Sequence, residues 1–243
     1  MKYSIELNLS NFWCLKKTAE TNDEICMTGF GVNDAGKVTV LPWRRIKSNT
    51  LTSFKTDDSI NQLTGGNNLL TGNLKDRRNL NYQFWLWIVE SDDFELLKRE
   101  HNFNEEGLEN EINREVEELS RLGYKNDTIY FQATANLITD FTGGIKRALY
   151  EHNNILGIGK KFEIFNPATI FYNCGKFIVT NPPQPAITDL NAGEYEIDNR
   201  LKEVSFRLNN SAEAYNEACY HLSYDIKLIA SGNSDGIISD LHS

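Results

Sequence analysis

Acidic and amide side chains gather in three short segments of this chain, and oxygen-bearing side chains of this kind can hold a calcium ion. The segments cover residues 20–24, 90–95 and 151–154. Calcium takes about six to eight oxygen ligands at roughly 2.3–2.6 Å, so it needs carboxylates and carbonyls arriving from several loops. The candidate ligands are Asp23, Glu24, Glu90, Asp92, Asp93, Asn153 and Asn154. They predict a calcium site only if the three segments meet in the folded chain.

A simpler interpretation of the same residues stays open. Acidic residues that follow strands are commonly just solvated, and Asp93 can instead cap a helix that begins at Phe94. Because Asn153 and Asn154 carry no charge, a site that includes them holds calcium less tightly than one built from aspartates.

Other kinds of site find less support in the sequence. The glycines at 65–66 and 157–159 lack the rest of a phosphate-binding loop, and no Gly-x-Ser-x-Gly motif occurs. Cys219 and His221 lie two residues apart on an expected strand, without the geometry that a nucleophile and its base need. The cysteines form no Cys-x-x-Cys pair and the histidines are dispersed, which predicts buried thiols rather than zinc. We therefore expect a protein that is not an enzyme, while a hydrolase site beneath residues 57–80 stays open.

The composition indicates a folded, acidic protein. Of its 243 residues, 40% are hydrophobic and 11% aromatic, enough to bury a sizeable core. The formal net charge of −9 argues against nucleic acid as a partner and against unaided adsorption to an anionic membrane. No apolar run approaches the ~20 residues that span a bilayer, and no signal-peptide pattern is present. We expect a soluble protein without a transmembrane segment, either cytoplasmic or exported without a conventional signal peptide.

Strand patterns dominate the first and last thirds of the chain. Alternation over residues 3–9 predicts a strand, and the runs 25–32 and 37–41 predict a hairpin. Residues 82–89 are apolar, aromatic and β-branched, which predicts a central strand. Residues 57–80 show little periodicity and predict a long irregular connection. Further strands are expected near 128–138, 161–165, 169–172, 176–179, 193–197, 204–208 and 219–228. One more strand near 51–55 would put the segments 20–24 and 90–95 at the same end of the sandwich.

Helical periodicity is clearest in the middle of the chain. Apolar residues recur every three or four positions from Leu108 to Leu122 and stop at Gly123, which predicts an amphipathic helix over 105–122. A shorter helix is expected at 145–150. We therefore predict a mainly β fold in a single domain, residues 1–243. Its architecture is an antiparallel β-sandwich with a helical insertion at about 94–152 after the central strand.

Short motifs along the chain resemble calcium-binding sandwich modules of some bacterial proteins. They are the C-x8-D-E spacing from Cys14 to Glu24, the Glu90-Ser91-Asp92-Asp93 stretch, residues 153–157, and the aromatic run 220–226. These modules are similar to the calcium- and phospholipid-binding domains of the synaptotagmin and protein kinase C kind. The resemblance implies acidic loops at one end of the sandwich that hold calcium and face a membrane or a protein partner.

Two functions from different classes remain at this point. The first is a non-catalytic binding module that depends on calcium at its acidic loops. The second is a structural or assembly component that oligomerises through the sandwich or through the 105–122 helix, whose apolar stripe motivates it.

Overall fold

The computed structural model shows a mainly β chain, and it describes residues 2–17, 21–74, 81–91, 94–100, 102–126, 129–156, 163–164, 168–173, 193–196, 202–207 and 218–231. The elements in chain order are β1 (Lys2–Lys16), β2 (Ile25–Asn33), β3 (Val38–Arg45), β4 (Ser59–Ile60), β5 (Asn68–Asn73), β6 (Asn81–Glu90), α1 (Phe94–Glu100), α2 (Glu105–Arg121), α3 (Ile129–Leu156), β7 (Glu163–Ile164), β8 (Ala168–Asn173), β9 (Gly193–Glu196), β10 (Lys202–Arg207) and β11 (Cys219–Ser231). The predicted fold class, a mainly β chain of antiparallel sheets with helices after a central strand, is confirmed.

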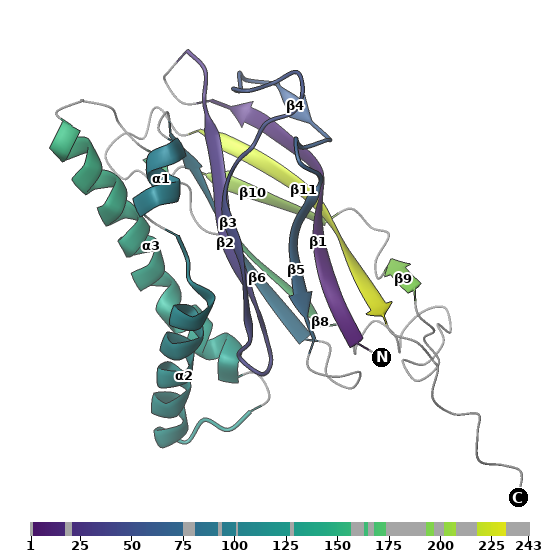
Figure 1. The fold of residues 1–243 in the computed structure, drawn as a ribbon, viewed down its shortest axis with the longest axis vertical. Helices are drawn as coiled ribbons and strands as arrows, with labels where there is room; N and C mark the ends of the chain where they lie inside the picture. The colour runs from purple at the N-terminus through teal and green to yellow at the C-terminus, as the bar shows by residue number, and fades with distance from the viewer. Residues whose placement is uncertain are drawn as a thin grey trace, which may run out of the picture.

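The strands form two antiparallel sheets (Figure 1). In the larger sheet the order is β10-β11-β1-β4, with β5 also paired to β1 and β9 to β11. In the smaller sheet the order is β3-β2-β6-β7, with β8 also paired to β6. The two longest-range partners, β1 and β11, run side by side from Lys2 opposite Ser231 to Lys16 opposite Cys219. The first and last described strands are therefore neighbours in one sheet.

An apolar layer, here called the inner layer, lies between the two sheets. Its buried members are Ile5, Leu7, Leu9, Phe12 and Cys14 of β1, Ile25 and Met27 of β2, Tyr82, Phe84, Leu86 and Ile88 of β6, Tyr220, Leu222, Tyr224 and Ile226 of β11, and Leu41, Ile46, Phe54, Ile60, Leu63, Leu69, Leu70, Leu74 and Ala218 around them. The strand residues alternate along each strand, because successive side chains of a strand point to opposite faces. This layer holds the two sheets of the sandwich together.

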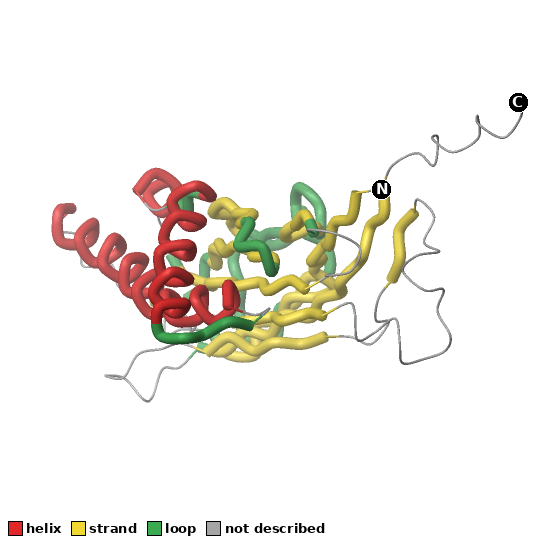
Figure 2. The backbone as a smooth tube through the Cα atoms, turned by 90° about the horizontal axis from the view of Figure 1, so that it is seen from below, coloured by secondary structure: helices red, strands yellow, loops and turns green. Residues whose placement is uncertain are grey.

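A second apolar layer, here called the outer layer, covers the other face of the smaller sheet. Its buried members are Cys26, Phe30 and Val32 of β2, Val38 and Trp43 of β3, Trp85, Trp87 and Val89 of β6, Leu97 of α1, Leu108, Ile112 and Leu119 of α2, and Phe131, Ala133, Leu137 and Phe141 of α3. Figure 2 shows the helices gathered on one side of the strands. Since β6 has helices on one face and the other sheet on its other face, its run from Phe84 to Val89 is apolar throughout, as in a central strand.

Helix α2 is the predicted amphipathic helix, observed over Glu105–Arg121. The side chain of Asn104 caps its first turn, because its Oδ1 accepts from the N–H of Glu106 at 3.0 Å. Gly123 follows the helix with a φ of 93°, a left-handed conformation that glycine adopts without strain. The apolar stripe of α2 packs into the outer layer, so sequence periodicity identified both the helix and its buried face.

The prediction of a strand at 128–138 is wrong, because residues 129–138 form the first part of α3. Its β-branched and aromatic residues favour a strand by propensity. However, Phe131, Thr134, Leu137 and Phe141 are all buried at intervals of three or four residues, which is helical spacing. The short helix expected at 145–150 is part of the same α3, which continues through Gly143 and Gly144.

The stretch 57–80 is less irregular than predicted, since it contains β4 and β5, both paired to β1. No named strand covers residues 51–55; Phe54 there forms an isolated bridge with Asp23. The strand expected at 176–179 lies outside the described residues. The remaining late strands were predicted within a few residues of their observed bounds.

Candidate functional site

Two of the three acidic segments meet at one end of the smaller sheet. Ile25 at the start of β2 lies opposite Glu90 at the end of β6. Next to this pair, the N–H of Glu24 donates to Oε1 of Glu90 at 3.3 Å, and the N–H of Ser91 donates to the carbonyl of Glu24 at 2.9 Å. The strand ends therefore bring Glu24 and Glu90 together.

The three acidic residues of this end already have partners. Asp23 is fully buried, and its Oδ2 accepts from the hydroxyl of Tyr220 at 2.5 Å. Glu24 forms an ion pair with Arg45, with 3.1 Å between Oε2 and Nη2. The described residues hold no group of three or more His, Cys, Asp or Glu side chains arranged for a metal ion.

Two of the other candidate ligands lie apart from this end of the sheet. Asn153 and Asn154 belong to α3 instead of a loop after a strand, and this end of α3 stands clear of the strands in Figures 1 and 2. Asp92 and Asp93 lie outside the described residues. Of the seven predicted ligands, the structure brings Glu24 and Glu90 side by side, while the side chain of Asp23 turns to Tyr220.

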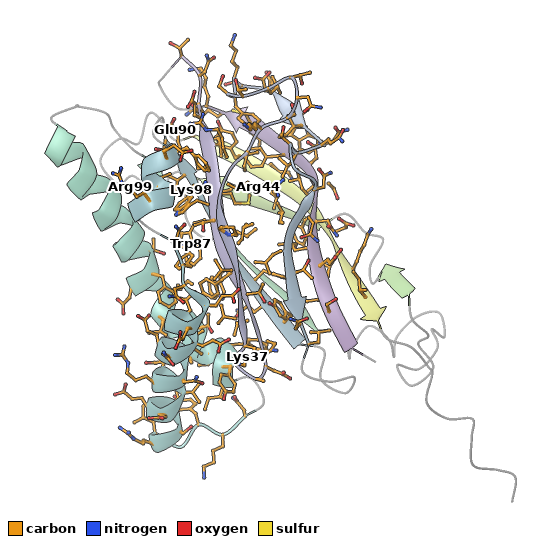
Figure 3. All side chains as sticks on the ribbon, viewed as in Figure 1. Lys37, Arg44, Trp87, Glu90, Lys98 and Arg99 are labelled. Carbon is orange, nitrogen blue, oxygen red and sulfur yellow. The ribbon has the colours of Figure 1, made fainter. Side chains whose placement is uncertain are left out.

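A pocket of about 680 Å³ opens beside this end, at the second half of β3, and is here called the β3 pocket. It is lined by Leu41, Pro42, Trp43, Arg44, Arg45 and Lys47 from β3 and the residues after it, by Thr64, Asn68 and Leu69 near the start of β5, and by Phe94 and Glu95 of α1. The lining of the pocket contains three cationic side chains and one acidic side chain. The pocket is therefore positively charged, although the chain as a whole has a net charge of −9. Figure 3 shows Arg44 and Glu90 in the same half of the molecule and Lys37 toward the opposite end of β3.

The two arginines of the β3 pocket are held in place by neighbours. Arg44 donates to the carbonyls of Asn68 at 3.0 Å and Thr64 at 3.2 Å, and also to the carbonyl of Gly66. Partial burial lowers the pKa of Arg44, but an arginine stays protonated in proteins. The positive charge of Arg44 is therefore fixed beside the loop that leads into β5.

Arg45 links the acidic end to the β3 pocket. Besides its ion pair with Glu24, its guanidinium carbon lies 5.6 Å from the centre of the Phe94 ring, a distance that suits a cation–π contact. Arg45 lies opposite Cys26 in the sheet, so the β2–β3 register sets its position. It neutralises charge where a calcium ion was predicted.

The sequence analysis missed these cations, although a signal was available. Trp43-Arg44-Arg45-Ile46-Lys47 places three cations within five residues, directly after a predicted strand, in a chain rich in acidic residues. The structural meaning of this run depends on the loop at 64–68 and on α1, neither of which is close in sequence.

Cys14 and Cys26 are buried free thiols, as predicted, whereas Cys219 is a free thiol that is only half-buried. Burial raises the pKa of Cys14 to about 11 and that of Cys26 to about 12. Both thiols are protonated near neutral pH and are poor nucleophiles in the folded state, because the thiolate is the reactive form.

Among the described residues, no helix is long and apolar enough to cross a membrane. Comparison of the chain with models of known protein families and with curated proteins gave no significant match. The geometry of the site therefore carries the functional argument.

Proposed function

We propose that this chain is a non-catalytic binding module whose β3 pocket receives an anionic group. The observation that carries the proposal is the gathering of Arg44, Arg45 and Lys47 around a pocket of about 680 Å³ in an acidic chain. A protein partner or a membrane surface, the partners expected from the sequence, can each present such a group, and so can a small molecule.

The three cations play different parts in this proposal. Arg44 and Arg45 are anchored by the contacts described above and supply positive charge at fixed positions, so little conformational entropy is lost when a ligand binds. Lys47 is exposed, and its ammonium group can approach an anion that enters the pocket. Hydrogen bonds between ionised partners are about twice as strong as neutral ones. Lys47 is therefore the cation most available for direct contact.

The aromatic side chains add an apolar wall to the pocket. Phe94 is partly buried and carries Arg45 on its ring, while Trp43 belongs to the outer layer. Ligand pockets typically combine apolar walls with a few polar groups that fix orientation. We therefore expect a ligand with a flat apolar part next to its negative charge.

Titration calorimetry with benzoate and its neutral analogue benzamide tests this function. We expect benzoate to bind more tightly, because only it carries a charge for the pocket cations. Lys47→Gln should weaken benzoate binding on the order of tenfold, the equivalent of about 1.4 kcal/mol. Lys55→Gln removes the same charge from an exposed lysine that does not line the pocket, and it is the matched control. Equal binding of the two compounds, or equal losses in the two variants, would refute an anion-binding pocket.

Calcium dependence is a second proposal for the same module, favoured by the meeting of Glu24 and Glu90. A calcium ion there would compete with Arg45 for the Glu24 carboxylate. If calcium binds the folded state, millimolar calcium should raise the melting temperature, and Glu90→Gln should reduce that rise. An unchanged melting temperature in the parent protein speaks against a calcium site at this end.

An assembly role through the apolar stripe of α2 is less favoured. Leu108, Ile112 and Leu119 are buried in the outer layer and are already covered within one chain. A contact with another subunit through α2 would have to use the charged face of the helix.

A further inference from the structure

Among the strands that the structure describes, β3 is at the edge of the smaller sheet, with β2 on one side of it. Its first half, Val38-Thr39-Val40-Leu41, is uncharged and rich in β-branched residues. An edge strand of this composition offers unpaired backbone N–H and C=O groups and invites pairing with another strand. Of these four residues, Leu41 also lines the β3 pocket, and Val38, Thr39 and Val40 do not.

Helix α2 covers this half with two glutamates. The N–H of Val38 donates to Oε1 of Glu109 at 3.1 Å, and the N–H of Val40 donates to Oε1 of Glu105 at 3.1 Å. Four residues of a helix advance about 6.0 Å, and two residues of a strand advance about 6.8 Å. This near match lets glutamates four apart on the helix reach amides two apart on the strand.

Residues at both ends of Val38–Leu41 also limit pairing with another strand. Pro42 has no N–H group to offer to another strand. At the other end, Lys37 holds Glu109 in place through a contact of 2.8 Å between Nζ and Oε2. Burial pushes the pKa of Glu109 upward, but the hydrogen bonds from Lys37 and Val38 and the charge of Lys37 outweigh it, so the pKa lies below its usual value. The carboxylate therefore stays ionised, and accepting, at neutral pH.

We infer that α2 is an edge guard, whose Glu105 and Glu109 occupy the N–H groups through which β3 would otherwise pair with β3 of a second copy of this chain. An antiparallel pair centred on Thr39 would set Val38 of one copy opposite Val40 of the other. It would thus match apolar residues across a two-fold axis. The surface is self-complementary, so a second copy is the partner it fits. This inference does not depend on the β3 pocket binding an anion.

The double variant Glu105→Ala, Glu109→Ala tests the guard by removing both acceptors. Sedimentation velocity over a concentration series should show its self-association constant raised on the order of tenfold or more over that of the parent protein. The matched control is Glu106→Ala, Glu111→Ala, which removes the same charge from two exposed positions of α2 that make no such contact with β3. Association equal to that of the parent, or equal association in the control, overturns the inference.

A third substitution separates edge pairing from association caused by unfolding. Adding Val40→Pro to the double variant removes the N–H group that pairing at the edge requires, and proline is tolerated on edge strands. Self-association should then return to the level of the parent protein. Association that persists in the triple variant arises elsewhere, and that result also overturns the inference. In Glu105→Gln, Glu109→Gln the amide oxygens can still accept, so we expect less association than in the alanine pair.

Discussion

The inner and outer layers occupy opposite faces of the same two strands, β2 and β6, yet they are assembled differently. The inner layer joins strands from both ends of the described chain, and its buried hydrogen bond from Tyr220 to Asp23 spans 197 residues. The outer layer joins β6 to the helices that follow it directly, between Phe94 and Phe141. The inner layer is built from segments that are far apart in the sequence, and the outer layer is built largely from segments that follow one another.

This difference predicts how the molecule opens. Regions with fewer long-range contacts tend to open locally at lower free energy than the global unfolding transition. Helices α1, α2 and α3 contact only one face of the smaller sheet, whereas β6 lies between two layers. We expect the helices to exchange their amide hydrogens before β6 does.

The strongest test of the comparison truncates one large side chain in each layer of β6. Phe84→Ala and Trp87→Ala each remove a fully buried ring, and each should cost about 3–5 kcal/mol in urea unfolding. Trp87→Ala also removes the hydrogen bond from the indole Nε1 to Thr142 Oγ1, which is 3.0 Å long. In hydrogen exchange followed by mass spectrometry, Trp87→Ala should speed exchange in α2 and α3 more than in β1.

The control in this experiment is Phe84→Ala itself. Because Phe84 belongs to the layer that joins the two sheets, its loss should speed exchange in β1 and β11 at least as much as in the helices. Identical exchange patterns in the two variants would contradict the distinction between the layers.

A smaller effect is expected where the inner layer approaches the backbone most closely. A Cβ atom at Gly31 would lie 2.2 Å from Tyr82 Cε1, and one at Gly72 would lie 2.0 Å from Tyr82 Cζ. Gly31→Ala should therefore destabilise by about 1–3 kcal/mol through overpacking.

A double-mutant cycle checks the cause of this loss. If the Tyr82 ring is the obstacle, Gly31→Ala should cost much less in a Tyr82→Ala background than in the parent protein. Equal costs in the two backgrounds would place the strain elsewhere, for example in the backbone of β2.

The sequence predicted the elements whose own pattern determines them. Strand β6 is apolar at consecutive positions because both faces are covered, and α2 has an apolar stripe because one face is covered. The start of α3 was missed since Ile129, Tyr130 and Phe131 favour a strand by propensity. Packing against α2 and β2, which that segment alone does not encode, selects the helix.

The candidate site likewise contains one relation that the sequence predicts and one that it does not. The meeting of Glu24 and Glu90 follows from antiparallel strands, whose ends could be located in the sequence. The role of Arg45 depends on its register opposite Cys26 and on Phe94, which lies 49 positions further along the chain. No local pattern encodes either relation, so the neutralised acidic end and the β3 pocket could not be predicted.

A gain in stability is expected at Gly143, just before residues 145–150, where a separate short helix was predicted but α3 is continuous. Gly143 is exposed within α3, and nothing lies within 4 Å of a Cβ atom added there. Gly143→Ala should stabilise the protein by about 0.5–1 kcal/mol, because glycine costs more conformational entropy than alanine in a helix.

The exposed Ala135 of the same helix supplies the reverse control. Ala135→Gly should destabilise by a similar amount, and both values come from chemical denaturation. A loss of stability in Gly143→Ala would mean that α3 is interrupted at the glycine pair, so that the outer layer is covered by two helices instead of one.

The smallest expected effect is on acid stability, at the contact between α2 and the edge strand β3. The pKa of Glu109 is lowered from an ordinary value of 4.5, because the hydrogen bonds from Lys37 and Val38 and the charge of Lys37 outweigh the effect of burial. A carboxyl group with a lowered pKa contributes stability that is present above its unfolded-state pKa and is lost as the pH falls through its folded-state pKa. The free energy of unfolding should therefore fall less steeply between about pH 5 and pH 3 in Glu109→Gln than in the parent protein. Glu106→Gln removes the same charge from an exposed position and should keep the parent slope. If the two variants show the same slope, the contact of α2 with the β3 edge contributes nothing to the acid stability of the outer layer.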